Sequence, residues 1–310
     1  MLPAESGNTG LAVEAYARPG RWKRTWASTV DYLASPVNAV AAVVLLASLV
    51  AALFAPLLTS FDPNLAVPKD RLLGIGEEGH LLGTDPIGRD VFTRLVYGAR
   101  LAWIVGSSVS VVSLLAGGTI GAMGGYFGGW FDSVSSRIVD AVLSFPPVLL
   151  ALVIAAVASP STGAAILALA IVFSPLAARV MRSVIAGERR LDYVSASRGL
   201  GHREGWTLVR HVLPNTVGPM FVVATIVVSR AIIVESSLSF IGAGTQPPTA
   251  SWGLMIAEAQ EVLRTEQQLI IIPAIVLILT VLSINLTADA LADHLDPAGQ
   301  VSASRGRKQQ

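Results

Sequence analysis

Cysteine is absent from all 310 residues of the chain, which excludes disulfides, thiolate metal sites and a cysteine nucleophile. Charge is also scarce, because charged residues make up only 14% of the chain whereas hydrophobic residues make up 53%. The mean hydropathy of +0.62 is too high for a soluble globule with a charged surface. These proportions predict an integral membrane protein.

Lysine is nearly absent as well, since only Lys23, Lys69 and Lys308 occur and none of them follows a glycine. A phosphate-binding loop of the GxxxxGK[ST] kind is therefore excluded. The four histidines are scattered, and no pair has the spacing of metal ligands. We expect a chain that is not an enzyme, with no catalytic residue, no metal site and no bound cofactor. Any ATP that drives it would bind another polypeptide.

Six apolar runs are long enough, or nearly so, to cross the roughly 30 Å hydrocarbon layer at about 1.5 Å per residue. They comprise residues 37–58, 101–126, 139–158, 163–181, 217–238 and 269–286. Pro146-Pro147 predicts a kink near the start of the third run. The predicted fold class is an all-α membrane protein with six transmembrane helices and both termini on one side.

The distribution of basic residues predicts which side that is. With the N-terminus inside, fifteen of the 22 Lys and Arg lie on the cytoplasmic side, six lie outside and Arg230 lies within a span. We therefore expect a cytoplasmic tail (1–35), a first transmembrane helix (36–58), an extracytoplasmic loop with an interfacial helix (59–100), a five-helix core (101–290) containing a cytoplasmic loop (189–215), and a cytoplasmic tail (291–310).

The most informative stretch is the polar insert Leu191–Asn215, LDYVSASRGLGHREGWTLVRHVLPN, which lies between two apolar runs. Asp192 can N-cap a short helix over Tyr193–Leu200. Gly201 permits a sharp exit, and Pro214 suits the first turn of a new helix. Small residues in the short helix would allow a partner to approach closely. These residues are Ser195, Ala196, Ser197 and Gly199.

This insert resembles the EAA loop of permease subunits of binding-protein-dependent ABC importers. Ser195-Ala196-Ser197, Gly201 and Leu213-Pro214 fall in register on that family's Glu-Ala-Ala, Gly and Leu-Pro positions, although Ser195 replaces its Glu and His211 its Ile. The resemblance implies a type I importer permease fold, in which the loop docks on a cytoplasmic ATPase subunit. The ATPase-coupling residues would be Asp192, Tyr193, Ser195, Ala196, Ser197, Gly199, Gly201, Leu213 and Pro214. An ordinary basic loop is the alternative.

A second stretch, HLLGTDPIGRDVFTRLVYGARLAW, begins at His80. Asp85-Pro86 and Gly88 predict a turn, and Asp90 can cap the helix that follows. We expect this helix to lie at the membrane interface while its arginines snorkel outward. These are Arg89, Arg94 and Arg100. The stretch resembles a signature of the C-type permeases of dipeptide, oligopeptide and nickel importers.

A third stretch, LSFIGAGTQPPTASWGLMIAEAQ, begins at Leu238 and also resembles the peptide-importer permeases. Its glycines and Pro247-Pro248 interrupt the helix. Trp252 then begins an amphipathic segment at the outer interface, where indole rings are common. We expect Trp252 either to contact an extracytoplasmic binding protein or to serve only as a membrane anchor.

Two charges lie deep within the fifth run. Arg230 is roughly 20 Å along its helix, and Glu235 is about 140° further round, so the two cannot share a face. An unpaired charge there costs at least about 2.5 kcal/mol. Arg230 and Glu235 are therefore candidates for the translocation pathway. A structural pair between Arg230 and an acid on a partner permease is the alternative.

The resemblance implies a permease subunit of an ATP-driven importer of di- or oligopeptides in a prokaryotic cytoplasmic membrane. Its partners would be a second homologous permease, two ATPase subunits that bind ATP and Mg²⁺, and an extracytoplasmic solute-binding protein, with no nucleic acid. Nickel, haem or another small solute remains open as substrate. An ion-coupled secondary transporter would explain the apolar runs equally well, but it should carry several carboxylates at membrane depth, where Glu235 is nearly alone and Asp140 lies at a span edge.

Overall fold

The computed structural model describes residues 35–295, so the two expected tails fall mostly or wholly outside the described residues. Within that range the chain is helical, and its one β-bridge joins Thr84 to Asp90. The α-helices are α2 (Pro36–Leu58), α3 (Val91–Phe127), α4 (Gly129–Leu143), α5 (Pro147–Val157), α6 (Thr162–Glu188), α7 (Asp192–Gly199), α8 (Glu204–Thr207), α9 (Leu213–Phe240), α10 (Trp252–Glu258) and α11 (Gln268–Leu295). Short turns η1 (Pro68–Asp70), η2 (Glu77–Gly79), η3 (Leu208–Val212) and η4 (Ala259–Val262) complete them.

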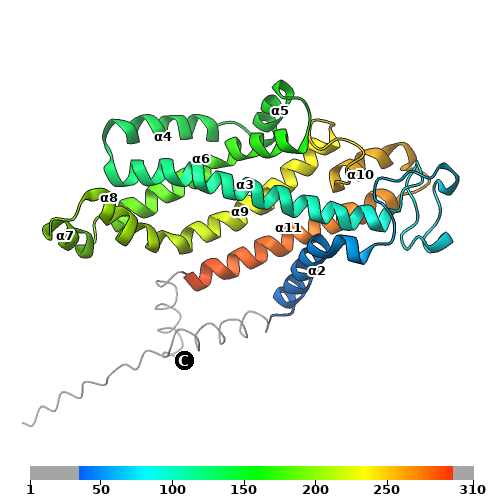
Figure 1. Ribbon diagram of the computed structural model, residues 1–310, viewed down its shortest axis with the longest axis horizontal. Helices are drawn as coiled ribbons and strands as arrows, with labels where there is room; N and C mark the ends of the chain where they lie inside the picture. Colours follow the sequence, from blue (N-terminus) through cyan, green and yellow to red (C-terminus); the bar gives the residue numbers. More distant parts are fainter. Residues whose placement is uncertain (1–34, 296–310) are drawn as a thin grey trace, which may run out of the picture.

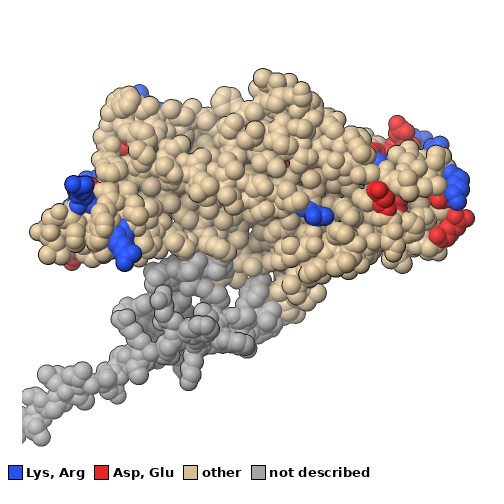
Figure 2. Space-filling view, viewed as in Figure 1, with Lys and Arg blue, Asp and Glu red and all other residues tan. Residues whose placement is uncertain are grey.

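Helices α3, α6 and α9 run along the long axis of the molecule and form its centre (Figure 1). Helices α2 and α11 pack together along one side of this centre, and α4 packs against α3 and α6 on another. Charged side chains gather at the two ends of the molecule, and a band with few charged side chains separates them (Figure 2). This distribution is that of a bundle that crosses a membrane along its long axis.

Five helical segments of the described range are long and apolar enough to cross a membrane. They are α2, α3, α6, the continuous run Glu204–Phe240 and Gln268–Ala290 within α11. A sixth crossing exists only if α4 and α5 count together, and these two helices are bent by 95°. The expectation of six spans is therefore met only in that broken form.

The break between α4 and α5 follows from two adjacent prolines. Pro147 occupies the first turn of α5, where its missing N–H costs nothing, and Pro146 before it adopts φ −58° and ψ 127°. A residue that precedes proline is pushed away from helical angles. The predicted kink is therefore confirmed at this position, but it separates two helices instead of bending one, and the first of them begins ten residues earlier than expected.

The contact between α3 and α6 brings the two backbones together. A Cβ at Gly117 would lie 2.0 Å from the carbonyl oxygen of Ser174, and one at Gly121 would lie 2.2 Å from that of Ala178. No other residue than glycine fits at either position without displacing α6. The glycines of α3 therefore allow the close helix packing that small residues give in membrane proteins.

Helix α3 begins where the sequence predicted, because the Asp90 carboxylate accepts a hydrogen bond of 2.7 Å from the backbone N–H of Thr93. The predicted separate interfacial helix is wrong, since α3 continues from Val91 through Phe127 without a break. The predicted outward snorkelling is also wrong for two of the three arginines. Arg89 and Arg94 are buried, and only Arg100 is exposed.

Arg94 instead joins three segments at one end of the molecule. Its Nη2 lies 3.2 Å from Oε2 of Glu258 on α10, and Nη1 donates to the carbonyl oxygens of Pro63 and Pro248 at 3.1 and 3.3 Å. Arg89 joins the same carboxylate at 2.5 Å. A planar guanidinium can reach several acceptors at once, and this explains why an arginine is buried at this place.

We expect Arg94→Lys to destabilise the purified subunit by about 3 kcal/mol, because a lysine ammonium cannot reach all three segments and leaves buried acceptors without a donor. Thermal unfolding in detergent measures the change. Arg100→Lys is the matched control, since Arg100 is exposed on the same helix. Equal melting temperatures for the two variants would contradict the bridging role.

Candidate functional site

Helix α7 lies at one end of the molecule, beyond the ends of α3 and α6 (Figure 1). It begins at Asp192, one residue earlier than predicted, and Leu191 takes the N-cap position with φ −77° and ψ 149°. The predicted capping by Asp192 is wrong, because no side chain caps this helix. The Asp192 carboxylate lies instead in the first turn, where it interacts favourably with the helix dipole.

One face of α7 is buried and the opposite face is free. Val194 and Ser197 are 0% and 5% exposed. The hydroxyl of Ser197 lies 3.0 Å from that of Thr207 on α8, so Ser197 fastens α7 to the chain that follows. Ser197 therefore cannot belong to the partner-facing set in which it was predicted. The exposed residues of α7 are Asp192, Tyr193, Ser195, Ala196 and Gly199. Of these, Asp192, Ser195, Ala196 and Gly199 share one helix face. We call these four residues the small-residue face.

The exit from α7 needs a glycine. Gly201 has φ +79°, a left-handed conformation that glycine adopts readily, so the predicted sharp exit is confirmed. The chain then enters α8 and passes through the π-helical turn Leu208–Val212 into α9. Leu213 and Pro214 do begin α9, with Leu213 partly buried, but Pro214 does not separate two helices as expected. It stands in the first turn of α9, and the π-helical turn before it keeps the run from Glu204 to Phe240 continuous.

A three-way hydrogen-bond cluster holds the start of α7 against α6 and α9. The Tyr193 hydroxyl donates to the Glu188 carboxylate at the end of α6. The side-chain amide of Asn215 donates to both, at 3.1 Å to Tyr193 and 3.2 Å to Glu188. Partial burial and the bond to Glu188 raise the pKa of Tyr193 above its ordinary value, so the phenol remains a donor at neutral pH.

Glu235 lies at the opposite end of α9, and it is 1% exposed. Its Oε1 accepts hydrogen bonds from the hydroxyls of Ser239, Thr245 and Ser251 at 2.7, 3.0 and 3.1 Å. The carboxylate thereby fixes the loop that joins α9 to α10. Because this cage encloses it, Glu235 does not line a pathway in this conformation, contrary to expectation.

Trp252 is 1% exposed, so the expectation that its indole lies at the outer interface is wrong. The ring nitrogen donates to the backbone oxygen of Leu95 at 3.0 Å, and the ring fills the space left by the absent side chain of Gly98. In this conformation Trp252 cannot touch a binding protein. It positions α10 against α3 instead.

Arg230 is exposed, and no hydrogen bond or ion pair to it occurs among residues 35–295. It therefore faces away from Glu235, as the helical spacing predicted. The choice between a pathway residue and a structural pair with a partner subunit stays open at this point.

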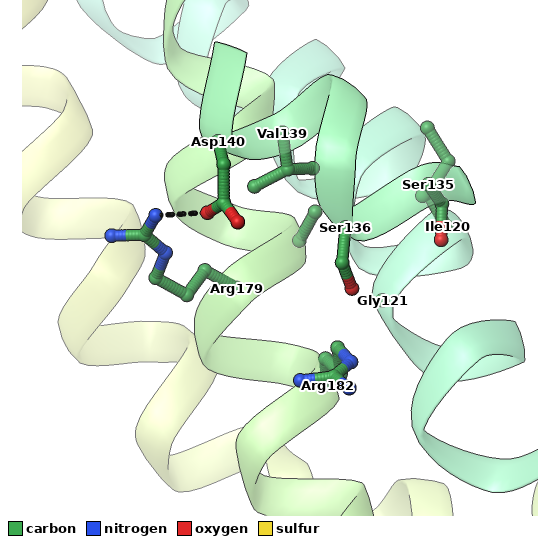
Figure 3. Close-up of a pocket in the computed structure, with 9 residues that line it drawn as sticks. Ile120, Gly121, Ser135, Ser136, Val139, Asp140, Arg179 and Arg182 are labelled. Carbon is green, nitrogen blue, oxygen red and sulfur yellow. Dashed lines mark hydrogen bonds and ion pairs between the residues drawn. The ribbon is translucent and has the colours of Figure 1, made fainter. Parts of the chain in front are cut away.

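The sequence analysis missed a group of charges between α4 and α6. Arg179 on α6 reaches across to Asp140 on α4, with 2.5 Å between Nη2 and Oδ1 (Figure 3). Arg182, one turn further along α6, pairs through two nitrogens with Asp132. Asp140, Arg179 and Arg182 border a small cavity of about 80 Å³, together with Ser135 and Ser136. The signal was an Arg-x-x-Arg spacing in α6, whose two arginines were counted among the fifteen basic residues on the cytoplasmic side.

The first pair is unusual because both partners are solvent-accessible on helices from the apolar part of the chain. The side chain of Arg179 is 56% exposed and that of Asp140 is 65% exposed. Exposure to lipid would be costly for either charge. A position against water or another protein would avoid this cost.

A protein-family model described as the inner membrane component of binding-protein-dependent transport systems matches residues 117–299, more than half of the chain. The chain belongs to this family. The matched range contains α7, its small-residue face and the charged pairs between α4 and α6.

Several relatives of this permease are similar over most of its length. The dipeptide transport system permease protein DppC of Alkalihalophilus pseudofirmus is 39% identical over 246 residues, which cover 79% of this chain and 81% of the relative. The di/tripeptide permease DppC of Pseudomonas aeruginosa is 38% identical, with 79% and 83% covered. The glutathione permease GsiD of Pectobacterium atrosepticum is 33% identical, with 89% and 91% covered.

The fold also has a counterpart among solved structures. A chain of the MetNI methionine ABC transporter, in an inward-facing conformation, superposes with a TM-score of 0.54 and 16% identity. The match covers 66% of this permease and 97% of that chain. The type I importer permease fold expected from the sequence is confirmed.

We expect Gly201→Ala to destabilise the permease by about 1 to 2 kcal/mol, because a Cβ at positive φ meets the following carbonyl oxygen. Gly205→Ala is the control, since Gly205 is helical and a Cβ added there would meet no neighbouring atom within 4 Å. That substitution should stabilise by about 0.5 to 1 kcal/mol. Shifts of the same sign in thermal unfolding would show that the turn does not need a glycine.

Proposed function

We propose that this permease forms half of the translocation pore of an ATP-driven importer of di- or oligopeptides. The observation that carries the proposal is the geometry of α7, whose exposed small-residue face includes Ser195 and Ala196, the residues at the first two positions of the EAA pattern. The side chains of this face are small, and the face lies at one end of the bundle. Hydrogen bonds hold the start of α7 to the end of α6 and the start of α9. Relatives that span most of the chain are described as dipeptide and di/tripeptide permeases, which supports the substrate class.

The exposed face of α7 and the absence of a P-loop in the sequence indicate which partners the permease needs. The small-residue face of α7 suits helix-in-groove docking on a cytoplasmic ATPase subunit, which would bind the ATP and Mg²⁺. The sequence contains no P-loop lysine, so the nucleotide site belongs to that partner. An extracytoplasmic solute-binding protein would deliver the peptide at the end that carries α10. We propose that Asp192, Ser195, Ala196 and Gly199 form the ATPase contact and that Tyr193, Ser197 and Gly201 hold its shape.

The pore needs a second, homologous permease. Arg230 is an exposed cation on a membrane-spanning helix, and no described residue neutralises it. It would therefore face either the aqueous pathway or a carboxylate of the second permease. The Asp140–Arg179 pair offers a similar argument for the opposite half of the bundle, because its unused donors and acceptors point outward from α4 and α6. Peptide termini are themselves charged, and charged side chains along the pore would form hydrogen bonds with them during passage.

The orientation we propose places α7 in the cytoplasm of a prokaryotic cell. Basic side chains are conspicuous at the end of the molecule that carries α7 and α8 (Figure 2). Excess Lys and Arg mark the cytoplasmic side of membrane proteins. The chain termini would lie on the same side.

The cysteine-free sequence makes this orientation simple to test with single introduced cysteines. Arg203 and Thr249 are both exposed, and they lie at opposite ends of α9. An impermeant thiol reagent added to intact cells should label Thr249→Cys and not Arg203→Cys, whereas permeabilised cells should show both. Labelling of Arg203→Cys in intact cells would reverse the proposed orientation.

The function itself is tested by purification and uptake. A tagged permease extracted in mild detergent should carry with it a second permease and two ATPase subunits, and cells that lack the permease should lose uptake of a labelled dipeptide. A stable homo-oligomer without ATPase would favour an ion-coupled transporter. Loss of nickel or haem uptake with unchanged dipeptide uptake would show that the substrate is nickel or haem and not a peptide.

A further inference from the structure

Tyr126 lies in the last turn of α3, and it is 1% exposed although it stands at the end of the molecule that carries α7. Its ring belongs to the hydrophobic core of the bundle, together with Val194 of α7 and Leu208 of η3. A buried tyrosine in such a place needs a partner for its hydroxyl, because an unsatisfied buried hydroxyl is costly. The partner in this protein comes from the loop that contains α7.

The hydroxyl of Tyr126 donates to Oε2 of Glu204, the first residue of α8, at 2.7 Å. The other carboxylate oxygen of Glu204 lies 3.1 Å from Nε of Arg198 on α7. One carboxylate therefore joins the end of α3 to both helices of the loop. Tyr126 is far in sequence from Arg198 and Glu204, and no pattern in the sequence associates them.

The aromatic ring of Tyr126 adds two further contacts. The guanidinium carbon of Arg198 lies 5.6 Å from the ring centroid, and that of Arg189, which caps the end of α6, lies 5.9 Å away. Both distances are within the range of cation–π attraction. Tyr126 thus touches residues at the end of α6, in α7 and at the start of α8.

The segment of α3 that carries Tyr126 cannot move independently of α6. A Cβ at the neighbouring Gly125 would lie 2.6 Å from the backbone oxygen of Arg182, so the two backbones are in contact there. A displacement of α7 that reaches Tyr126 through Glu204 therefore reaches α3 and α6 as one body.

Two other routes leave α7. The turn around Gly201 consists of exposed residues and is easier to deform. The hydrogen bonds of Tyr193 to Glu188 and Asn215 join only the start of α7 to α6 and α9, and they do not reach α3.

We propose that the Tyr126–Glu204 hydrogen bond, with Arg198 attached, is the joint that transmits movement between α7 and the membrane-spanning helices α3 and α6. Tyr126 is on this account a positioning residue, because it contacts neither nucleotide nor substrate. The inference rests on the proposed docking of α7 on an ATPase. It adds the residues through which that contact acts on the pore.

The test uses the whole complex in lipid nanodiscs and measures ATP hydrolysis with and without the loaded binding protein. Tyr126→Phe keeps the ring and removes one hydroxyl. We expect assembly and basal hydrolysis to be unchanged and the stimulation by binding protein to fall about tenfold, the loss of one hydrogen bond to a charged group. Tyr97→Phe on the same helix is the control, since no hydrogen bond of the Tyr97 hydroxyl occurs in the described range.

A second pair of variants decides the matter if Tyr126→Phe does not assemble. The Glu204 side chain is 51% exposed, so its replacement should not prevent folding. Glu204→Ala removes the acceptor and should lower stimulation, whereas Glu204→Gln keeps an oxygen for Tyr126 and should restore most of it. Wild-type stimulation in Tyr126→Phe or Glu204→Ala, or equal losses in both Glu204 variants, would overturn the joint. A wild-type complex without stimulation would instead contradict the proposed function.

Discussion

The backbone contact between α3 and α6 is the constraint on which the rest of this structure depends. Three glycines at intervals of four residues, Gly117, Gly121 and Gly125, face carbonyl oxygens of α6 at distances that leave no room for a side chain. In a bilayer there is little hydrophobic force between helices, so close packing of this kind supplies the association instead. The two helices consequently form one rigid unit over the two turns from Gly117 to Gly125.

That unit carries the structures at both ends of the molecule. At the end opposite α7, the N-cap Asp90 and Arg94 of α3 fix the preceding loop and α10 through buried hydrogen bonds. At the other end, α6 leads directly into α7, and α3 ends with Tyr126 bound to Glu204. A binding event on the outer loops and a binding event on α7 therefore act on the same pair of helices, which gives a physical route for coupling in either direction.

Much of this architecture could be predicted from the sequence, because helices in a bilayer must be long, apolar and internally hydrogen-bonded. Local signals were also reliable where one residue decides the backbone, as with Asp90 at the start of α3, Gly201 after α7 and the break at Pro146. The register of the polar insert predicted the short helix α7, although its cap and the side to which Ser197 points were wrong, and the partner contact of α7 stays a prediction.

The errors share a physical origin, since they concern side chains whose partners are distant in sequence. Arg94, Trp252 and Glu235 each looked exposed or pathway-facing because polar or amphipathic groups near membrane ends usually are. Their burial depends on acceptors and donors from other segments, such as Glu258 for Arg94 and Leu95 for Trp252. Long-range pairs like Asp140 with Arg179 were invisible for the same reason.

The central claim, that α7 presents its small-residue face to an ATPase while its other face is bound to the bundle, is open to one direct measurement. A photo-cross-linking amino acid at Ser195, which is exposed, would be activated in intact cells and its products identified by mass spectrometry. The account predicts a covalent adduct with an ATPase subunit at this position and none from the same amino acid at Thr249. Adducts at Ser195 with lipid, with the second permease or with no protein would contradict it.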